Sequence, residues 1–126
     1  MIVIDASVLA TALGDDGQGG TQARARIRGE DLAAPEIIDL EVVSVWRRTL
    51  TDERRAALAL IDLADIPLHR APHLPLLERS WELRHNLTPY DASYVALAEA
   101  LEVDLVTADR RLTRAAGIRC DVEVFG

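Results

Sequence analysis

The stretch LTPYDASYVALAEALEVDLVTADRRL, residues 87–112, carries the clearest structural signals in this chain. Thr88-Pro89-Tyr90-Asp91 is the capping-box pattern of a helix start, with proline at the first helical position and an acid at the third. We therefore expect a helix that runs to residue 102. A short β-forming run follows over residues 104–107, and Asp109 comes just after it. The stretch thus predicts a helix that leads into a strand with an acidic residue at its carboxyl end.

The rest of the chain repeats this alternation of short strands and helices. Residues 2–4 predict a strand that ends at Asp5 and leads into a helix over residues 6–13. Further helices are predicted over residues 21–28, 36–50, 52–65, 74–86 and 110–116, and further strands over residues 68–71 and 121–125. Residues 32–34 fit either a brief strand or a simple connection. This alternation is typical of the α/β class, in which helices cover both faces of a parallel sheet.

Three local patterns refine the prediction. The segment GDDGQGG, residues 14–20, is too rich in glycine to continue a helix and is predicted to be a loop. Pro35 suits the first position of the helix that follows it, and Thr51 can cap the next helix. Trp81 recurs with leucines at helical spacing, which predicts that it belongs to the core.

Length and composition predict one domain over residues 1–126. The chain has 126 residues and a formal net charge of −7 at pH 7, and this length fits a single domain. The excess of acid argues against a protein that coats nucleic acid by neutralising phosphates. All 14 basic residues are arginine. Mechanisms that need a lysine, such as P-loop phosphate binding or Schiff-base chemistry, are therefore excluded.

Other features favour a cytoplasmic protein without a membrane segment. The longest uninterrupted apolar run covers residues 56–61, far short of the roughly 20 residues that span a bilayer. The basic start and long apolar segment of a secretory signal are both missing. Cys120 is the single cysteine, so no internal disulfide can form, and this agrees with a reducing compartment.

Four acidic residues stand out by their positions. Asp5 and Asp109 follow predicted strands, and the carboxyl ends of neighbouring parallel strands share the edge where α/β proteins form their sites. Asp91 lies in the first turn of a predicted helix. Each of these aspartates could instead serve only as a helix cap. Glu41 lies on an apolar helix face, where an unpaired carboxylate is costly to bury, although Arg48 on the same face could reach toward it.

A divalent cation would explain several carboxylates at one edge, because only such an ion or a raised pKa relieves their repulsion. Ligand sets made of carboxylate oxygens favour Mg²⁺ or Mn²⁺ over zinc. His69 and His73 have the spacing of a helical zinc pair, but Pro72 lies between them and no HExxH motif is present. The residues therefore favour Mg²⁺, with Mn²⁺ as a substitute, and the helix-cap role of the aspartates stays open.

Three stretches together resemble the PIN-domain family, specifically the VapC-type ribonuclease toxins of bacterial toxin–antitoxin pairs. They are IVIDASVL (residues 2–9), LEVVSVWRR (residues 40–48) and the stretch over residues 87–112. The resemblance implies a three-layer α/β/α sandwich around a mainly parallel sheet. It also implies Mg²⁺- or Mn²⁺-dependent hydrolysis of RNA phosphodiester bonds, neutralisation by a cognate VapB-type antitoxin, and a homodimer.

The same resemblance implies roles for individual residues. The acids that match the metal-coordinating, catalytic positions of the family are Asp5, Glu41, Asp91 and Asp109. Ser7 and Thr107 match hydroxyl positions that hold those carboxylates in orientation. The candidates to bind flanking phosphates are Arg110, Arg111 and Arg114. Relatives often carry an acid or asparagine where this chain has Arg111, and this departure weakens the case for a second metal site.

Two other interpretations are kept. A receiver-type signalling domain also combines this length with an acidic Mg²⁺ pocket, but it needs an acidic pair after the first strand and a late lysine. Here the pair Asp15-Asp16 lies elsewhere and lysine is absent. The second alternative is a PIN fold that binds a partner without nuclease activity, which only a test of cleavage separates from the enzyme.

Overall fold

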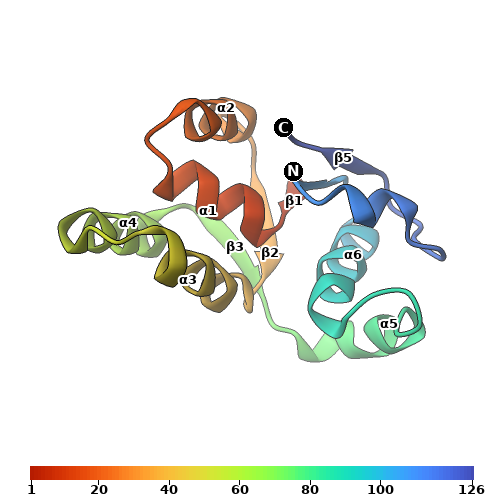
Figure 1. Ribbon diagram of the computed structural model, residues 1–126. Helices are drawn as coiled ribbons and strands as arrows, with labels where there is room; N and C mark the ends of the chain where they lie inside the picture. Colours follow the sequence, from red (N-terminus) through yellow and green to blue (C-terminus); the bar gives the residue numbers. More distant parts are fainter.

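Five parallel strands form one sheet at the centre of the molecule, in the order β3-β2-β1-β4-β5 (Figure 1). The computed structural model describes all 126 residues. The strands are β1 (Ile2–Ile4), β2 (Leu32–Pro35), β3 (Leu68–Ala71), β4 (Leu105–Thr107) and β5 (Val122–Val124). After β3 the chain crosses to the other side of β1 to form β4. The strand order therefore reverses between β1 and β4, which is where open α/β sheets bind their ligands.

Helices cover both faces of this sheet, as Figure 1 shows. They are α1 (Ala6–Gly14), α2 (Gln18–Ile27), α3 (Ile38–Thr49), α4 (Glu53–Asp65), α5 (Leu77–Glu82) and α6 (Pro89–Leu101), with 3₁₀ turns η1 (Leu74–Leu76) and η2 (Arg110–Arg114). On one side, α6 packs on β1, β2 and β4, and α5 packs against α6. On the other side, α1 contacts α2, α3 and α4. The predicted three-layer α/β/α sandwich is confirmed.

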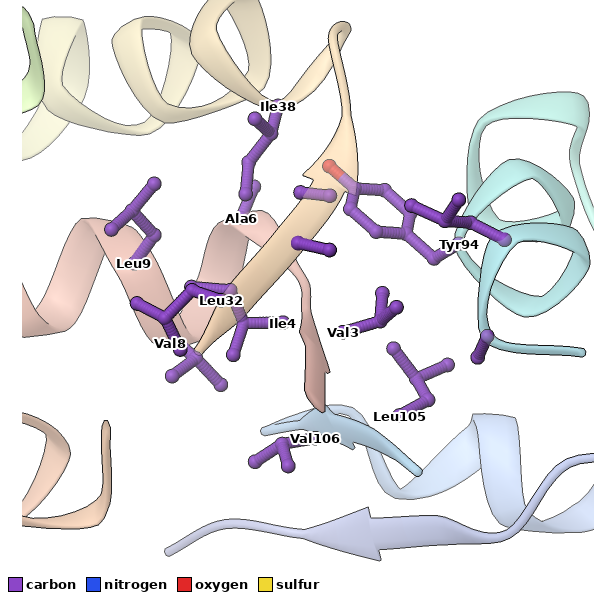
Figure 2. Packing of buried hydrophobic residues seen from close by; sticks show 14 of the residues in the cluster. Val3, Ile4, Ala6, Val8, Leu9, Leu32, Ile38, Tyr94, Leu105 and Val106 are labelled. Atoms are coloured by element: carbon purple, nitrogen blue, oxygen red, sulfur yellow. The ribbon is translucent and has the colours of Figure 1, made fainter. Parts of the chain in front are cut away.

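The hydrophobic core occupies both faces of β1. Val3 and Ile4 are fully buried, and their side chains point to opposite faces because the strand repeats every two residues. In Figure 2, Val3 and Leu105 lie toward Tyr94 of α6, whereas Ile4 lies beside Val8 of α1. The end of β1 is thus held between two packed layers, and the residue that follows it is Asp5.

The sequence predicts a loop over the whole glycine-rich segment, residues 14–20, but only part of this segment is a loop. The helix α1 extends to Gly14, and α2 already begins at Gln18, so it includes Gly19 and Gly20. A Cβ at Gly20 would lie 1.7 Å from the backbone oxygen of Asp15. Glycine is therefore required at this position because α2 begins so close to the end of α1, and that close approach outweighs its low helix propensity.

The segment over residues 74–86 also differs from its prediction. It is broken into η1 and the short helix α5, and Trp81 is 67% exposed. The buried side chains of this segment are instead Leu76, Ser80 and Leu83. Hydrophobic spacing indicated a helix, but two faces of that helix carried leucines. The helix face that packs on α6 is therefore not the one that carries Trp81.

Two helix starts differ by a few residues. Pro35 ends β2 instead of starting a helix, because the N–H of Glu36 continues the strand ladder with a hydrogen bond to the Ala71 oxygen (2.8 Å). The cap of α4 is Asp52, not Thr51, and its carboxylate accepts a hydrogen bond from the Arg55 N–H (3.0 Å). No helix of the protein combines the length and hydrophobicity needed to cross a bilayer.

Candidate active site

Asp5 lies directly after β1 and caps α1. Its Oδ1 accepts hydrogen bonds from Ser7 Oγ (2.5 Å) and from the backbone N–H of Val8 (3.2 Å). Its Oδ2 accepts a hydrogen bond from the hydroxyl of Thr107, at the end of β4. Burial raises the pKa of the Asp5 carboxyl, and these hydrogen bonds oppose the rise. The carboxylate is therefore held in one orientation although it is largely removed from water.

Thr107 and Ser7 link the ends of two strands. Thr107 Oγ1 accepts a hydrogen bond from the backbone N–H of Asp109 (2.9 Å), and Ser7 Oγ accepts one from the N–H of Ala108 (3.1 Å). The segment after β4 is thus fastened to Asp5 through two hydroxyl groups. The two hydroxyl residues that the sequence predicted as supports of the acids contact Asp5 directly.

Glu41 reaches the same edge from α3. Its Oε1 accepts a hydrogen bond from Tyr94 Oη (2.6 Å), across 53 residues of chain. Figure 2 shows Tyr94 projecting from α6 with its hydroxyl pointing away from that helix. Burial raises the pKa of Glu41, as do the nearby charges of Asp91 and Asp5, while the Tyr94 hydrogen bond lowers it. The partner of Glu41 in this structure is therefore Tyr94 and not Arg48.

Sequence reasoning missed the role of Tyr94. The sequence places this residue inside the helix predicted to run to residue 102, but it gives no indication that the residue belongs to the site. One signal was available: Tyr94 follows Asp91 by three residues in the same helix, and residues at that spacing share a face. Burial and the neighbouring acids raise the pKa of Tyr94, so its hydroxyl stays protonated and donates to Glu41.

Asp91 lies in the first turn of α6. Its backbone N–H donates to Thr88 Oγ1 (3.2 Å), so the capping pattern seen in the sequence is formed. Burial raises the pKa of its carboxyl, the charge of Asp109 raises it further, and the charge of Arg111 lowers it. The side chain therefore stands beside the other acids while the backbone serves as part of the cap. Asp91 can therefore take part in the helix cap and in the acidic site at the same time.

Asp109 differs from the other three acids because a cation neutralises it. Arg111 donates to both of its oxygens, with Nη2 2.7 Å from Oδ2 and Nε 3.0 Å from Oδ1. These hydrogen bonds hold the pKa of Asp109 below its ordinary value. Arg110 and Arg114 lie on the same turn η2, but they form no ion pair with any of the four acids.

The structure brings all four acids to one edge of the sheet, from four different elements. Burial raises the pKa values of Asp5, Glu41 and Asp91, and the charge of a neighbouring acid of this group raises each of them further. A cavity of about 190 Å³ opens beside Asp91, Asp109 and Arg111. The two histidines that were weighed as zinc ligands lie elsewhere, paired with Asp31 and Glu36.

The donor set fits a hard divalent cation in its chemistry. All the donors are carboxylate oxygens, and three of them carry a raised pKa with no cation in contact. The four carboxylates lie farther apart than they would around a bound ion. No three acidic, histidine or cysteine side chains of the protein lie close enough to bind one metal ion jointly. An ion would have to draw the carboxylates inward and compete with Arg111 for Asp109.

The fold and site together define an α/β domain with an acidic site where the strand order reverses. Comparison of the sequence with known families agrees with this class. Residues 2–118 match the PIN domain. The chain belongs to the PIN-domain family.

Individual relatives extend along nearly the whole chain. The sequence is 44% identical over 128 residues to VapC ribonuclease Mb0985 of Mycobacterium bovis, covering 98% of each chain. The fold is similar to that of VapC20 of Mycobacterium tuberculosis, a sarcin–ricin loop cleaving toxin, with a TM-score of 0.71 and 18% identity over 94% of this chain and 97% of that one. It is also similar to VapBC2 from Rickettsia felis, with a TM-score of 0.70 and 14% identity over 100% of both chains.

Proposed function

We propose that this chain is a ribonuclease toxin that hydrolyses RNA phosphodiester bonds with Mg²⁺, or with Mn²⁺ in its place. The observation that carries the proposal is the gathering of four carboxylates at the edge where the strand order reverses. Three of these have no cation in contact. The 44% identity to a VapC ribonuclease over 98% of both chains supports the same activity.

The proposed ligands of the ion are Asp5, Glu41, Asp91 and Asp109. When bound, such an ion supplies a polarised phosphate and a water of lowered pKa. Ser7 and Thr107 would keep the Asp5 carboxylate oriented toward the ion, and Tyr94 would do the same for Glu41. The candidates to bind phosphates on either side of the scissile bond are Arg110, Arg111 and Arg114. No side chain needs to act as a covalent nucleophile.

The test is a cleavage assay with purified protein freed of any antitoxin. We expect the protein to cut a structured RNA with Mg²⁺ or Mn²⁺, and we expect Asp5→Asn to abolish the cutting. Asp65→Asn, at the exposed end of α4, is the matched control and should cut normally. Cleavage that survives EDTA or Asp5→Asn would overturn the proposal. A folded protein that binds its antitoxin but cuts no RNA would be a partner-binding PIN domain instead.

We further propose a VapB-type antitoxin as the neutralising partner. The chain carries a formal net charge of −7, and its site is acidic. A basic segment of a partner therefore fits this pocket by charge. The similarity in fold to a chain of VapBC2 supports the proposal. The complex should weaken as salt rises, and titration calorimetry at two ionic strengths measures this. A salt-independent affinity would show that the acidic pocket is not the docking point.

The exposed apolar side chains support a homodimer. One group lies near α5 and the start of α6: Leu74, Leu77, Trp81 and Tyr90. A second group lies on α3 and α4: Leu40, Leu58, Leu60 and Ile61. Exposed apolar patches mark contacts between proteins. Light scattering of the isolated protein tests the dimer, and Trp81→Glu and Leu58→Glu distinguish the two surfaces. A monomer at all concentrations would contradict the proposal.

The cytoplasm is the compartment we propose. Cys120 is the only cysteine and forms no disulfide. Burial raises the pKa of its thiol to about 11, so the thiol stays protonated and unreactive at neutral pH. Cell fractionation tests the compartment, and recovery of the protein outside the cytoplasm would contradict it.

A further inference from the structure

One arginine already fills part of the proposed metal site. Arg111 is the only cation that forms an ion pair with any of the four acids. Its side chain donates to both oxygens of Asp109, and its backbone N–H also donates to Oδ1 (2.9 Å). A divalent ion that takes Asp109 as a ligand must therefore displace the guanidinium group.

The ion pair is built so that it can open. Asp109 and Arg111 are separated by a single residue, and the Arg111 side chain is 86% exposed. The Asp109 side chain is 27% exposed, but water solvates the exposed guanidinium well, and this weakens the pair. No other hydrogen bond of the Arg111 side chain fixes it in place, since all of its contacts go to Asp109. The guanidinium can therefore leave without disturbing the fold.

The surroundings of Arg111 indicate what it binds after leaving. It lines the cavity of about 190 Å³ together with Asp91, Thr88 and Asn86, next to the proposed metal ligands. A guanidinium group freed from its carboxylate there favours a new anion, and its planar set of donors matches the oxygens of a phosphate. In the proposed reaction, the anion that enters this cavity is the backbone of the RNA.

We propose that Arg111 is an exchangeable cation that neutralises Asp109 in the free protein and moves to a substrate phosphate when a metal ion takes Asp109. This inference rests on the proposed function. The two exchanges are linked, so metal binding and phosphate binding strengthen each other, and the linkage is reciprocal by thermodynamic necessity. Arg111 is then the residue that couples loading of the metal to recognition of the substrate.

The test measures Mn²⁺ affinity by electron paramagnetic resonance, with and without a short single-stranded DNA oligonucleotide. Without nucleic acid, Arg111→Ala should bind Mn²⁺ at least about 3-fold more tightly than Arg110→Ala, which removes the same charge from the same turn but breaks no contact with Asp109. The oligonucleotide should tighten Mn²⁺ binding about 5-fold or more in the wild type and clearly less in Arg111→Ala. Gel electrophoresis afterwards checks that the oligonucleotide is intact.

Two results would overturn the exchange. One is an Mn²⁺ affinity of Arg111→Ala that equals that of Arg110→Ala, and the other is coupling to the oligonucleotide that is as strong in Arg111→Ala as in the wild type. Because Arg111 is exposed, circular dichroism should confirm that the variant folds normally. The test also separates this inference from the proposed function. If the ion pair competes with metal, Arg111→Ala binds Mn²⁺ more tightly than Arg110→Ala even when the wild-type protein cuts no RNA.

Discussion

The hydroxyl of Thr107 donates a hydrogen bond to Asp5 across 102 residues of chain and accepts one from the backbone N–H of Asp109. This single side chain therefore connects the acid that follows β1 with the acid that follows β4. The connection exists because β1 and β4 pair in parallel, with Ile4 opposite Val106, so that the next residues on the two strands also lie side by side. The register of two short strands thus sets the geometry of the site.

Replacing Thr107 tests this connection. Thr107→Val keeps the shape of the side chain but removes the hydroxyl, so a largely buried carboxylate loses a donor. We expect unfolding free energy to fall by about 1.5–3 kcal/mol, and metal affinity to fall about 10-fold or more. Urea denaturation and Mn²⁺ titration measure the two effects. Thr113→Val is the control, because the Thr113 hydroxyl is exposed and bonds only to the Arg110 carbonyl oxygen. Equal effects of both variants would contradict the role of Thr107.

A second prediction concerns Tyr94, which is 2% exposed and donates to Glu41 at 2.6 Å. Tyr94→Phe leaves the buried ring in place and removes only the donor. We expect a loss of stability of about 1.5–3 kcal/mol and a weaker affinity for Mg²⁺, because Glu41 is no longer held toward the other acids. Tyr90→Phe, on the exposed side of α6, should change neither quantity. Unaltered Mg²⁺ binding by Tyr94→Phe would show that Glu41 needs no positioning.

The sequence predicted the strands and most helices because their signals are local. The β-branched run of β1 and the capping pattern at Thr88 depend on neighbouring residues only, and both elements form where predicted. Trp81 shows the limit of such signals. Its segment carries leucines on more than one helix face, and only packing against α6 decides which face is buried. Gly20, in the first turn of α2, shows the same limit, because its role depends on a close approach in space.

The candidate site divides in the same way. Asp5 and Asp109 follow strands, so the sequence alone predicts that they meet at one edge. Glu41 was ambiguous, since its helical neighbours include Arg48 while its actual partner lies 53 residues away on α6. The ion pair between Asp109 and Arg111 was also not foreseen, although only one residue separates the two in the sequence. A sequence pattern assigns a residue to an edge of the sheet, but it does not tell which cation or donor reaches it.

The third prediction concerns Asp91 and Asp109, which differ because Arg111 forms an ion pair with Asp109 only. The pKa of Asp91 is raised by burial and by the charge of Asp109, so its ionised form destabilises the metal-free fold at neutral pH. Asp91→Asn should therefore raise stability without metal by about 1 kcal/mol, or roughly 4 °C in Tm. Added Mg²⁺ should stabilise this variant less than the wild type.

Asp109→Asn serves as the matched comparison for Asp91→Asn. Its carboxylate is already neutralised by Arg111, and its pKa is lowered by that pair, so removing the charge should bring no gain in metal-free stability. Calorimetry of both variants with EDTA and with Mg²⁺ measures the contrast. Equal stabilisation by the two substitutions would show that the four acids are equally crowded and that Arg111 does not distinguish Asp109.

The fourth prediction concerns stability in acid and lies outside the site. Glu99 on α6 accepts hydrogen bonds from Arg79 Nε (2.7 Å) and from the backbone N–H of Arg119 (2.9 Å), and its side chain is 13% exposed. Burial alone would raise the pKa of Glu99, but these contacts outweigh it and hold the pKa below its ordinary value of 4.5. A carboxyl group whose pKa is lowered by folding stabilises the protein above its unfolded pKa, and this contribution disappears as the pH falls through the folded pKa.

Glu99→Gln should therefore reduce unfolding free energy at pH 7 by about 1.5–3 kcal/mol. The difference from the wild type should shrink as the pH drops below 4.5, the ordinary value for this group, and vanish below the folded pKa. Glu82→Gln is the control, because Glu82 is 49% exposed and its oxygen lies 3.8 Å from Arg79, so it should cost little at any pH. Urea denaturation from pH 7 to pH 3 checks both variants. A Glu99→Gln deficit that persists unchanged at pH 3 would mean that packing, and not the charge of Glu99, ties α6 to Arg79.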